Sequence, residues 1–171
     1  MIIDLAEIEG PARPFEDSVP AAELNLEDLN FRLTGDVRVS GETQKGAAQI
    51  DVHGSIIAPA EIDCARCLEP ISQDLTFDFA VGFVPMERFA SDKEREVSAE
   101  DLDIDVLDSD RIDLKELVRE QILLNLPEQV FCSPDCKGLC LKCGTNRNLI
   151  DCKCNLDETD PRWAALKDFR S

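Results

Sequence analysis

The chain has 171 residues, which suits one domain or a domain with a small appended module. Its 36 acidic and 18 basic residues give a formal charge of −18, and its 43% of hydrophobic residues is enough for a core, which argues against wholesale disorder. No apolar stretch approaches the roughly 18 residues of a membrane span, and the N-terminus is acidic where an export signal would be basic. The sequence therefore predicts a soluble, cytoplasmic protein that does not bind membranes.

The first thirty residues predict little regular structure. Residues 2–8 alternate roughly between apolar and polar and predict a first strand. Residues 9–28 contain three prolines and indicate an irregular connection.

A clearer pattern begins at residue 31, where apolar residues recur at every second position. The pattern covers 31–39, then 48–62, and resumes over 75–83. Such a period of two is typical of an antiparallel sheet with one buried and one wet face. Gly54 and Pro59 are expected to break the second run or to insert a bulge.

The acidic surplus lies in the first two-thirds of the chain. Residues 1–113 hold 27 acids and 9 bases, whereas 114–171 hold nine of each. The stretch 87–101 is charged and poor in bulky apolar residues, which predicts an exposed, mobile loop, and 102–106 alternates like a short edge strand. An acidic surface repels a phosphate backbone, so it favours a basic protein partner or serves solubility alone.

One main helix is predicted after the acidic stretch. Asp113 can cap it, and Glu116 completes an acidic variant of the capping box. Apolar residues follow at helical spacing from Leu114 up to Pro127, which ends the helix. This helix is the natural cover for the apolar face of the predicted sheet.

Eight cysteines occur in four tight pairs. They make up a smaller share of the chain than the about 8–10% of a disulfide scaffold. Disulfides usually spread cysteines to close long loops, so tight pairs in a chain without an export signal indicate metal ligands. The pairs are Cys64 and Cys67, Cys132 and Cys136, Cys140 and Cys143, and Cys152 and Cys154.

The spacing of these pairs predicts one or two structural zinc ions. Cys140-Leu-Lys-Cys143-Gly144 has the form of a zinc knuckle, in which glycine supplies a positive φ. The preferred arrangement is two Cys₄ sites, one from the first two pairs and one from the last two. The alternatives are a single Cys₄ site grouped differently with the other cysteines as free thiols, disulfides, or a redox dithiol at Cys64 and Cys67. Redox dithiols sit at a helix N-terminus, whereas strands are predicted on both sides of this pair.

The sequence offers no specific catalytic set. A closed Cys₄ site is structural, because a catalytic zinc keeps an open position and usually has histidine or carboxylate ligands. The only histidine, His53, falls on the polar side of a predicted strand and indicates a surface residue. The phosphate-binding glycine motifs are absent and the carboxylates are dispersed. We therefore predict a protein that is not an enzyme and has no small-molecule substrate.

These patterns predict an α+β fold: an antiparallel β-sheet covered by one main helix, with a C-terminal Cys-rich zinc-binding loop module. The expected domains are 1–130 for the sheet and helix, including the acidic loop at about 87–101, and 131–171 for the zinc module. A short helix starting at Asp160 should close that module. The sequence leaves the oligomeric state open.

Three stretches match a known family pattern in combination. They are Cys64-Ala-Arg-Cys67-Leu68-Glu69 after a long strand, the predicted helix from Arg111 to Pro127, and the tail with Cys136-Lys-Gly-Leu-Cys140, Cys143-Gly144, Asn146, Asn148, Cys152, Cys154 and Asp160-Pro161-Arg162. Together they resemble the YceD family (DUF177), the large ribosomal RNA subunit accumulation proteins, over most of 30–166. Family tails often have proline where Leu141 stands, and not all members carry the tail.

The resemblance implies a non-enzymatic factor that supports accumulation of large-subunit (23S) ribosomal RNA or ribosome assembly. The implied partner is a ribosomal protein or a pre-ribosomal large subunit. We expect the acidic sheet face to hold a basic ribosomal protein. If the protein contacts RNA directly, the neutral C-terminal third is the expected place. Two alternatives are a zinc-stapled interaction module unrelated to ribosomes and a thiol- or metal-handling protein that uses Cys64 and Cys67.

Overall fold

The chain forms two compact units. The first, called here the sheet unit, comprises Met1–Ile62 and Ser72–Glu128, and the second, the cysteine unit, comprises Asp63–Ile71 and Gln129–Ser171. The turn between the two longest strands thus belongs to the cysteine unit. This computed structural model describes residues 2–5, 12–26, 30–46, 49–86, 104–107, 109–154 and 162.

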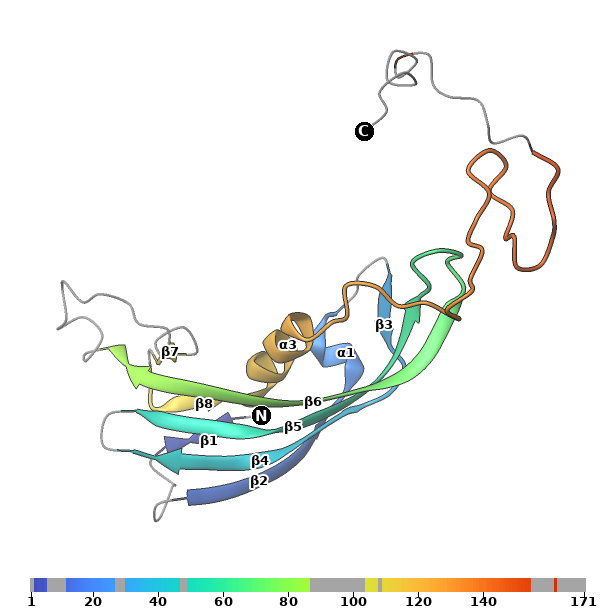
Figure 1. Cartoon of the computed structure of the whole chain (residues 1–171). Helices are drawn as coiled ribbons and strands as arrows, with labels where there is room; N and C mark the ends of the chain where they lie inside the picture. Colours follow the sequence, from blue (N-terminus) through green and yellow to red (C-terminus); the bar gives the residue numbers. More distant parts are fainter. Residues whose placement is uncertain are drawn as a thin grey trace. The chain divides into compact units, whose positions relative to one another are not determined.

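Strands dominate the sheet unit (Figure 1). A large sheet has the order β2-β4-β5-β6-β7, with β3 pairing with β5 beside this path, and β1 pairs with β8 in a second sheet. The pairs β1–β8, β2–β4, β3–β5 and β4–β5 are antiparallel, whereas β6 and β7 are parallel. The bounds are β1 Ile2–Asp4, β2 Ala12–Val19, β3 Phe31–Leu33, β4 Val37–Lys45, β5 Ile50–Asp63, β6 Pro70–Pro85, β7 Ile104–Leu107 and β8 Arg111–Asp113.

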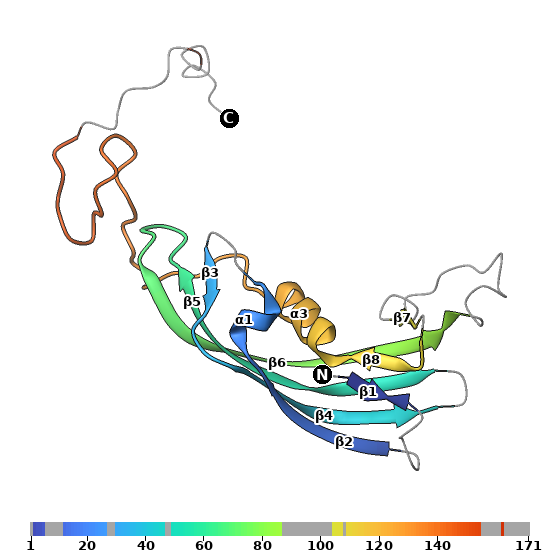
Figure 2. The ribbon, with the colours of Figure 1, turned by 180° about the vertical axis from the view of Figure 1, so that it is seen from behind.

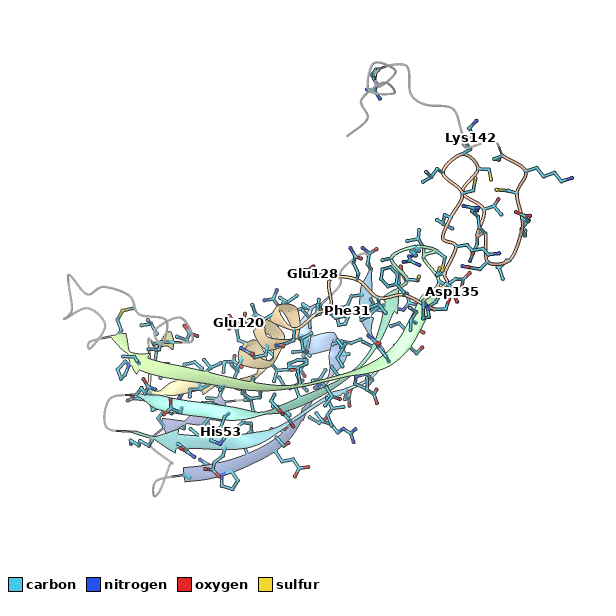
Figure 3. All side chains as sticks on the ribbon, viewed as in Figure 1. Phe31, His53, Glu120, Glu128, Asp135 and Lys142 are labelled. Atoms are coloured by element: carbon cyan, nitrogen blue, oxygen red, sulfur yellow. The ribbon has the colours of Figure 1, made fainter. Side chains whose placement is uncertain are left out.

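Strand β5 follows the predicted alternation without the predicted break. Its even-numbered apolar residues are buried, while His53 is exposed on the other face, opposite Glu42 of β4 (Figure 3). The expectation that Gly54 interrupts the strand is wrong. Gly54 pairs with Gly41 of β4, and a Cβ on either glycine would lie 2.8 Å from the Cα of the other. The glycines therefore permit close strand contact rather than ending the strand.

The predicted irregular connection over 9–28 is wrong in its described part. Residues Ala12–Val19 form β2, which pairs with β4 from Ala12 opposite Gln44 to Val19 opposite Val37. Proline is tolerated in β2 because this strand is at the edge of the large sheet, where one side of the backbone needs no partner. The short helix α1, Ala21–Leu24, follows directly.

The main helix, α3, spans Leu114–Leu124 and begins as predicted. The Asp113 carboxylate accepts hydrogen bonds from the backbone N–H groups of Lys115 (3.0 Å) and Glu116 (3.5 Å). In both views α3 lies beside α1 on one side of the large sheet (Figures 1 and 2). Its buried side chains are Leu114, Leu117, Val118 and Ile122.

The described structure is thus mostly β-sheet with two short helices, of which α3 is the main one, and two clusters of four cysteines. This confirms the predicted fold class in part, because the sheet and the single main helix are present but β-structure predominates. The predicted loop 87–101 and the predicted helix from Asp160 lie outside the described residues. Among the helices of the described ranges, none has the length and apolarity needed to cross a membrane.

Candidate metal centres

The eight cysteines come together in two groups of four, both in the cysteine unit. Within each group the Sγ atoms all lie within 4.8 Å of one another, and the cysteines are free thiols. The groups coincide with the preferred arrangement from the sequence. The first cluster consists of Cys64, Cys67, Cys132 and Cys136, and the second cluster of Cys140, Cys143, Cys152 and Cys154.

The first cluster is built on a tight turn that follows β5. The Leu68 N–H donates to the Cys64 carbonyl (2.9 Å), and the Cys64 N–H donates to the Glu69 carbonyl (2.9 Å). Leu68 has a φ of 60° at this turn, in the left-handed region that favours glycine. The turn brings the first two sulfur atoms together, while the chain after α3 supplies the other two.

The second cluster uses the same turn. The Gly144 N–H donates to the Cys140 carbonyl (2.8 Å), and the Cys140 N–H donates to the Thr145 carbonyl (2.9 Å). Gly144 has a φ of 71°, which confirms the positive φ predicted for this glycine. Both C-x-x-C motifs therefore form the same hydrogen-bonded knuckle, although only the second has glycine at the left-handed position.

The sulfur separations in the first cluster fit four thiolates around one metal ion. Cys64 Sγ lies 3.8 Å from Cys136 Sγ, and Cys67 Sγ lies 3.6 Å from Cys132 Sγ. Tetrahedral coordination with zinc–sulfur bonds of about 2.3 Å requires sulfur atoms about 3.8 Å apart. A disulfide would need about 2.05 Å. The donor set and its spacing thus suit a tetrahedral thiolate-binding metal.

The local environment favours thiolate at Cys64 and protonated thiol at Cys67. Burial raises the pKa of Cys64, but N–H groups of Cys132, Arg66 and Cys67 donate to its sulfur and lower its pKa to about 6. At Cys67 the N–H of Glu69 lowers the pKa, yet burial and the neighbouring sulfur atoms raise it to about 12. Four adjacent sulfur atoms cannot all carry a negative charge without a cation, so metal binding would release protons here.

The second cluster likewise contains one cysteine with a strongly lowered pKa and one with a strongly raised pKa. The Thr145 hydroxyl, whose oxygen lies 3.3 Å from Cys143 Sγ, and the Thr145 N–H lower the pKa of Cys143 to about 6. The neighbouring Cys143 sulfur is the largest cause that raises the pKa of Cys154 to about 12. Hydrogen bonds, from the Asn148 side chain among others, also lower the pKa of Cys136, and backbone N–H groups of Cys143 and Lys142 lower that of Cys140. Each cluster therefore has two sulfur atoms whose surroundings favour the thiolate that a metal requires.

Arg66 fastens the loop of the first cluster and was not singled out by sequence reasoning. Its guanidinium donates to the carbonyls of Pro134 and Cys136, both at 3.1 Å, and lies 4.4 Å from the centroid of the Phe131 ring. An arginine inside a C-x-R-C motif is the signal that could have indicated this role. A planar guanidinium can donate to two carbonyls while stacking on a ring, which lysine cannot do.

The two clusters differ in burial. Cys64, Cys67 and Cys136 are buried, and the partly buried Ile71 packs against them. In the second cluster Cys143 is exposed, and the neighbouring apolar side chains Leu141 and Leu149 are 93% and 76% exposed. The second cluster therefore has little apolar packing of its own.

The fold and the site together define a class: a β-sheet protein with two Cys₄ clusters, one of them at a hairpin turn. The sequence model described as "Large ribosomal RNA subunit accumulation protein YceD" matches residues 52–170, which include all eight cysteines. The chain belongs to the YceD family. The family is named for RNA accumulation rather than for a reaction.

Several proteins resemble the chain over most of its length. The uncharacterized protein YlbN of Bacillus subtilis is 28% identical over 167 residues, covering 97% of this chain and 92% of the relative. An uncharacterized protein of Mycobacterium tuberculosis is 30% identical over 97% of this chain and 79% of its own length. The "Large ribosomal RNA subunit accumulation protein YCED homolog 1, chloroplastic" of Zea mays is 28% identical over 78% of this chain and 55% of its own length. No solved structure matches the chain significantly.

Proposed function

We propose that this chain is a cytoplasmic, non-enzymatic factor that supports accumulation of large-subunit (23S) ribosomal RNA by binding a ribosomal protein or a large-subunit precursor. The observation that carries this proposal is the family match over 52–170. The relatives from Zea mays and Arabidopsis thaliana are named as chloroplastic large ribosomal RNA subunit accumulation proteins.

The polar face of the large sheet is the proposed binding surface. Its outward positions alternate with buried ones along β4, β5 and β6, and acids recur on them. Across β2 and β4, Glu16 pairs with Ser40, which places both on this face. A basic ribosomal protein complements such a surface, whereas an RNA backbone is repelled. Acids of this face include Glu16, Glu42, Asp51, Glu61, Asp74 and Asp78.

We further propose that each cluster holds one structural zinc ion through its four thiolates. The sulfur separations of 3.6 and 3.8 Å in the first cluster support this. A closed set of four thiolates leaves no position for a substrate, so zinc would supply folding energy, about 10–16 kcal/mol in small metal-folded modules. In this proposal residues 131–171 are the zinc module, to which the core, 1–130, contributes the turn with Cys64 and Cys67, and α3 covers the core sheet.

The test compares two sets of charge reversals of equal size. Asp74→Lys with Asp78→Lys changes the proposed face, and Glu23→Lys with Glu128→Lys changes exposed acids elsewhere. Tagged proteins are run on sucrose gradients with cell extract, and 23S ribosomal RNA is quantified in cells that depend on each variant. We expect the wild type and the control variant to co-sediment with large-subunit precursors. The face variant should no longer co-sediment with them, and cells that depend on it should contain less 23S ribosomal RNA.

Two results would count against the proposal. A wild-type protein that sediments alone and whose loss leaves 23S ribosomal RNA unchanged would remove the ribosomal role. Equal losses in both reversal variants would remove the sheet face as the binding surface. Precursor binding that depends on RNA, with no ribosomal protein recovered after nuclease treatment, would instead indicate direct RNA contact.

A further inference from the structure

We infer that Asn148 is a positioning residue that joins the two clusters, so that metal binding at one strengthens metal binding at the other. This inference rests on the proposed metal binding. Asn148 lies in the segment between the two cysteine pairs of the second cluster, yet its side-chain amide donates to Cys136 Sγ of the first cluster at 3.2 Å. Its side-chain oxygen accepts from the Lys137 N–H at 2.8 Å.

The second cluster's own segment holds Asn148 in this position. The Asn148 N–H donates to the Asn146 side-chain oxygen at 2.9 Å, and the N–H groups of Leu149 and Ile150 donate to the Asn146 carbonyl, both at 3.1 Å. Asn146 also forms a β-bridge with Leu139. The ends of this segment are Cys143 and Cys152, so closing the second cluster restricts the chain that presents Asn148.

Further hydrogen bonds connect this segment, the linker between the clusters and the first knuckle. The Asn146 amide donates to the Glu69 carboxylate at 3.2 Å, and the Arg147 N–H donates to the Gly138 carbonyl at 2.9 Å. The Leu139 N–H donates to the Arg66 carbonyl at 3.0 Å. The two clusters therefore share one hydrogen-bonded frame rather than two independent loops.

Gly138 shows how closely the linker between the clusters approaches the first knuckle. It has a φ of 70°, and a Cβ at this position would lie 2.9 Å from the Arg66 carbonyl oxygen. The linker between the clusters therefore contacts the backbone of the first knuckle directly. Only glycine combines this conformation with this contact.

The chemistry of the Asn148 contact gives the coupling its direction. An amide N–H that donates to a thiolate stabilises the anionic form that a metal requires. Loss of such an outer contact typically weakens metal affinity about 10- to 100-fold. Coupling between two binding equilibria is reciprocal, so the occupied first cluster also favours the closed second cluster.

The test measures metal affinity of the full-length chain by competition with a chromophoric chelator. Cobalt replaces zinc in parallel, because its sulfur charge-transfer and visible bands report on tetrahedral thiolate ligation. Asn148→Ala removes the donor. Asn148→Asp keeps the acceptor for the Lys137 N–H but places a carboxylate beside Cys136. Arg147→Ala is the matched control, since the contact described for that residue uses its backbone.

We expect Asn148→Ala to weaken the first cluster about 10- to 100-fold, Asn148→Asp to weaken it at least as much, and Arg147→Ala to leave it within about twofold. Emptying the second cluster with Cys143→Ser and Cys154→Ser should weaken the first cluster in the wild type. The same change should have little further effect in Asn148→Ala, because the coupling is already lost.

Two outcomes would overturn the inference and can be told apart. If both metals bind and either Asn148 variant keeps wild-type affinity at the first cluster, the coupling through Asn148 is wrong while the proposed zinc sites stand. If the wild-type chain binds neither zinc nor cobalt, the zinc proposal fails and the coupling fails with it.

Discussion

The two cysteine clusters combine identical turns with different surroundings. Both knuckles close with the same pair of backbone hydrogen bonds, at Cys64 and at Cys140. Three of the four cysteines of the first cluster are buried and Arg66 fastens its loop, whereas only Cys140 of the second cluster is buried. The comparison teaches that a C-x-x-C spacing specifies the turn locally, while protection of the sulfur atoms comes from chain segments that are distant in sequence.

The largest expected effect is loss of one metal ion from either cluster. Cys67→Ser should remove the metal of the first cluster and Cys143→Ser that of the second, because each deletes one of four thiolate ligands. We expect two zinc ions per chain in the wild type and one in each variant by elemental analysis, with a lowered unfolding temperature. One zinc in the wild type that is lost only with Cys143→Ser would contradict the paired arrangement and restore Cys64 and Cys67 as a free dithiol.

The difference in burial predicts an order of metal release. Each cluster has one exposed cysteine, Cys132 or Cys143, but three cysteines of the first cluster are buried and only Cys140 of the second is. A chelator in excess should therefore empty the second cluster first. Stopped-flow measurement of chelator absorbance should show two phases, and Cys143→Ser should delete the faster one. If Cys143→Ser instead deleted the slower phase, the second cluster would be the one that releases its metal last, contrary to the prediction.

In the metal-free chain, one thiol should be clearly the most reactive. The pKa of Cys143 is about 6 and that of Cys154 about 12, so at pH 7 Cys143 is mostly thiolate and Cys154 is protonated. Cys64 has the same pKa of about 6 but is buried, which slows alkylation. Iodoacetamide labelling followed by peptide mass spectrometry should modify Cys143 first, and lowering the pH to about 5 should slow this because the thiolate becomes protonated. Equal labelling at pH 5 and pH 7 would refute the assignment.

The smallest expected effects come from the left-handed positions of the two knuckles. Gly144→Ala should destabilise the second knuckle by about 1 kcal/mol, because a side chain disfavours its φ of 71°. Leu68→Gly should have the opposite sign at the first knuckle, where a leucine that is 57% exposed already occupies a φ of 60°. Denaturant titration of the metal-loaded chain compares the two. A loss from Leu68→Gly larger than that from Gly144→Ala would mean that leucine packing outweighs backbone strain.

Features that depend on neighbouring residues were accessible from the sequence. The capping of α3 by Asp113, the alternation along β5 and the knuckle at Gly144 each follow from residues a few positions apart. The cysteine spacing also led to the observed grouping, because four pairs close in sequence can combine in only a few ways.

Features that depend on a distant partner were missed. Residues Ala12–Val19 form a strand despite Pro14, because an edge position tolerates proline and pairing with β4 compensates for weak local propensity. The predicted strand break at Gly54 was wrong because the close contact with Gly41 depends on the register of two strands. Sequence motifs contain no register, so neither outcome could be obtained from propensity alone.

The sequence by itself determined the membership of the family, the two knuckles and the predominance of strands, since these depend on spacing and periodicity. Tertiary structure alone decided that Arg66 fastens the first loop and that Asn148 reaches Cys136 from the segment of the other cluster. The physical reason is that a side-chain hydrogen bond depends on distances of about 3 Å between chain segments. Those distances are fixed only when both knuckles and the linker between them have folded.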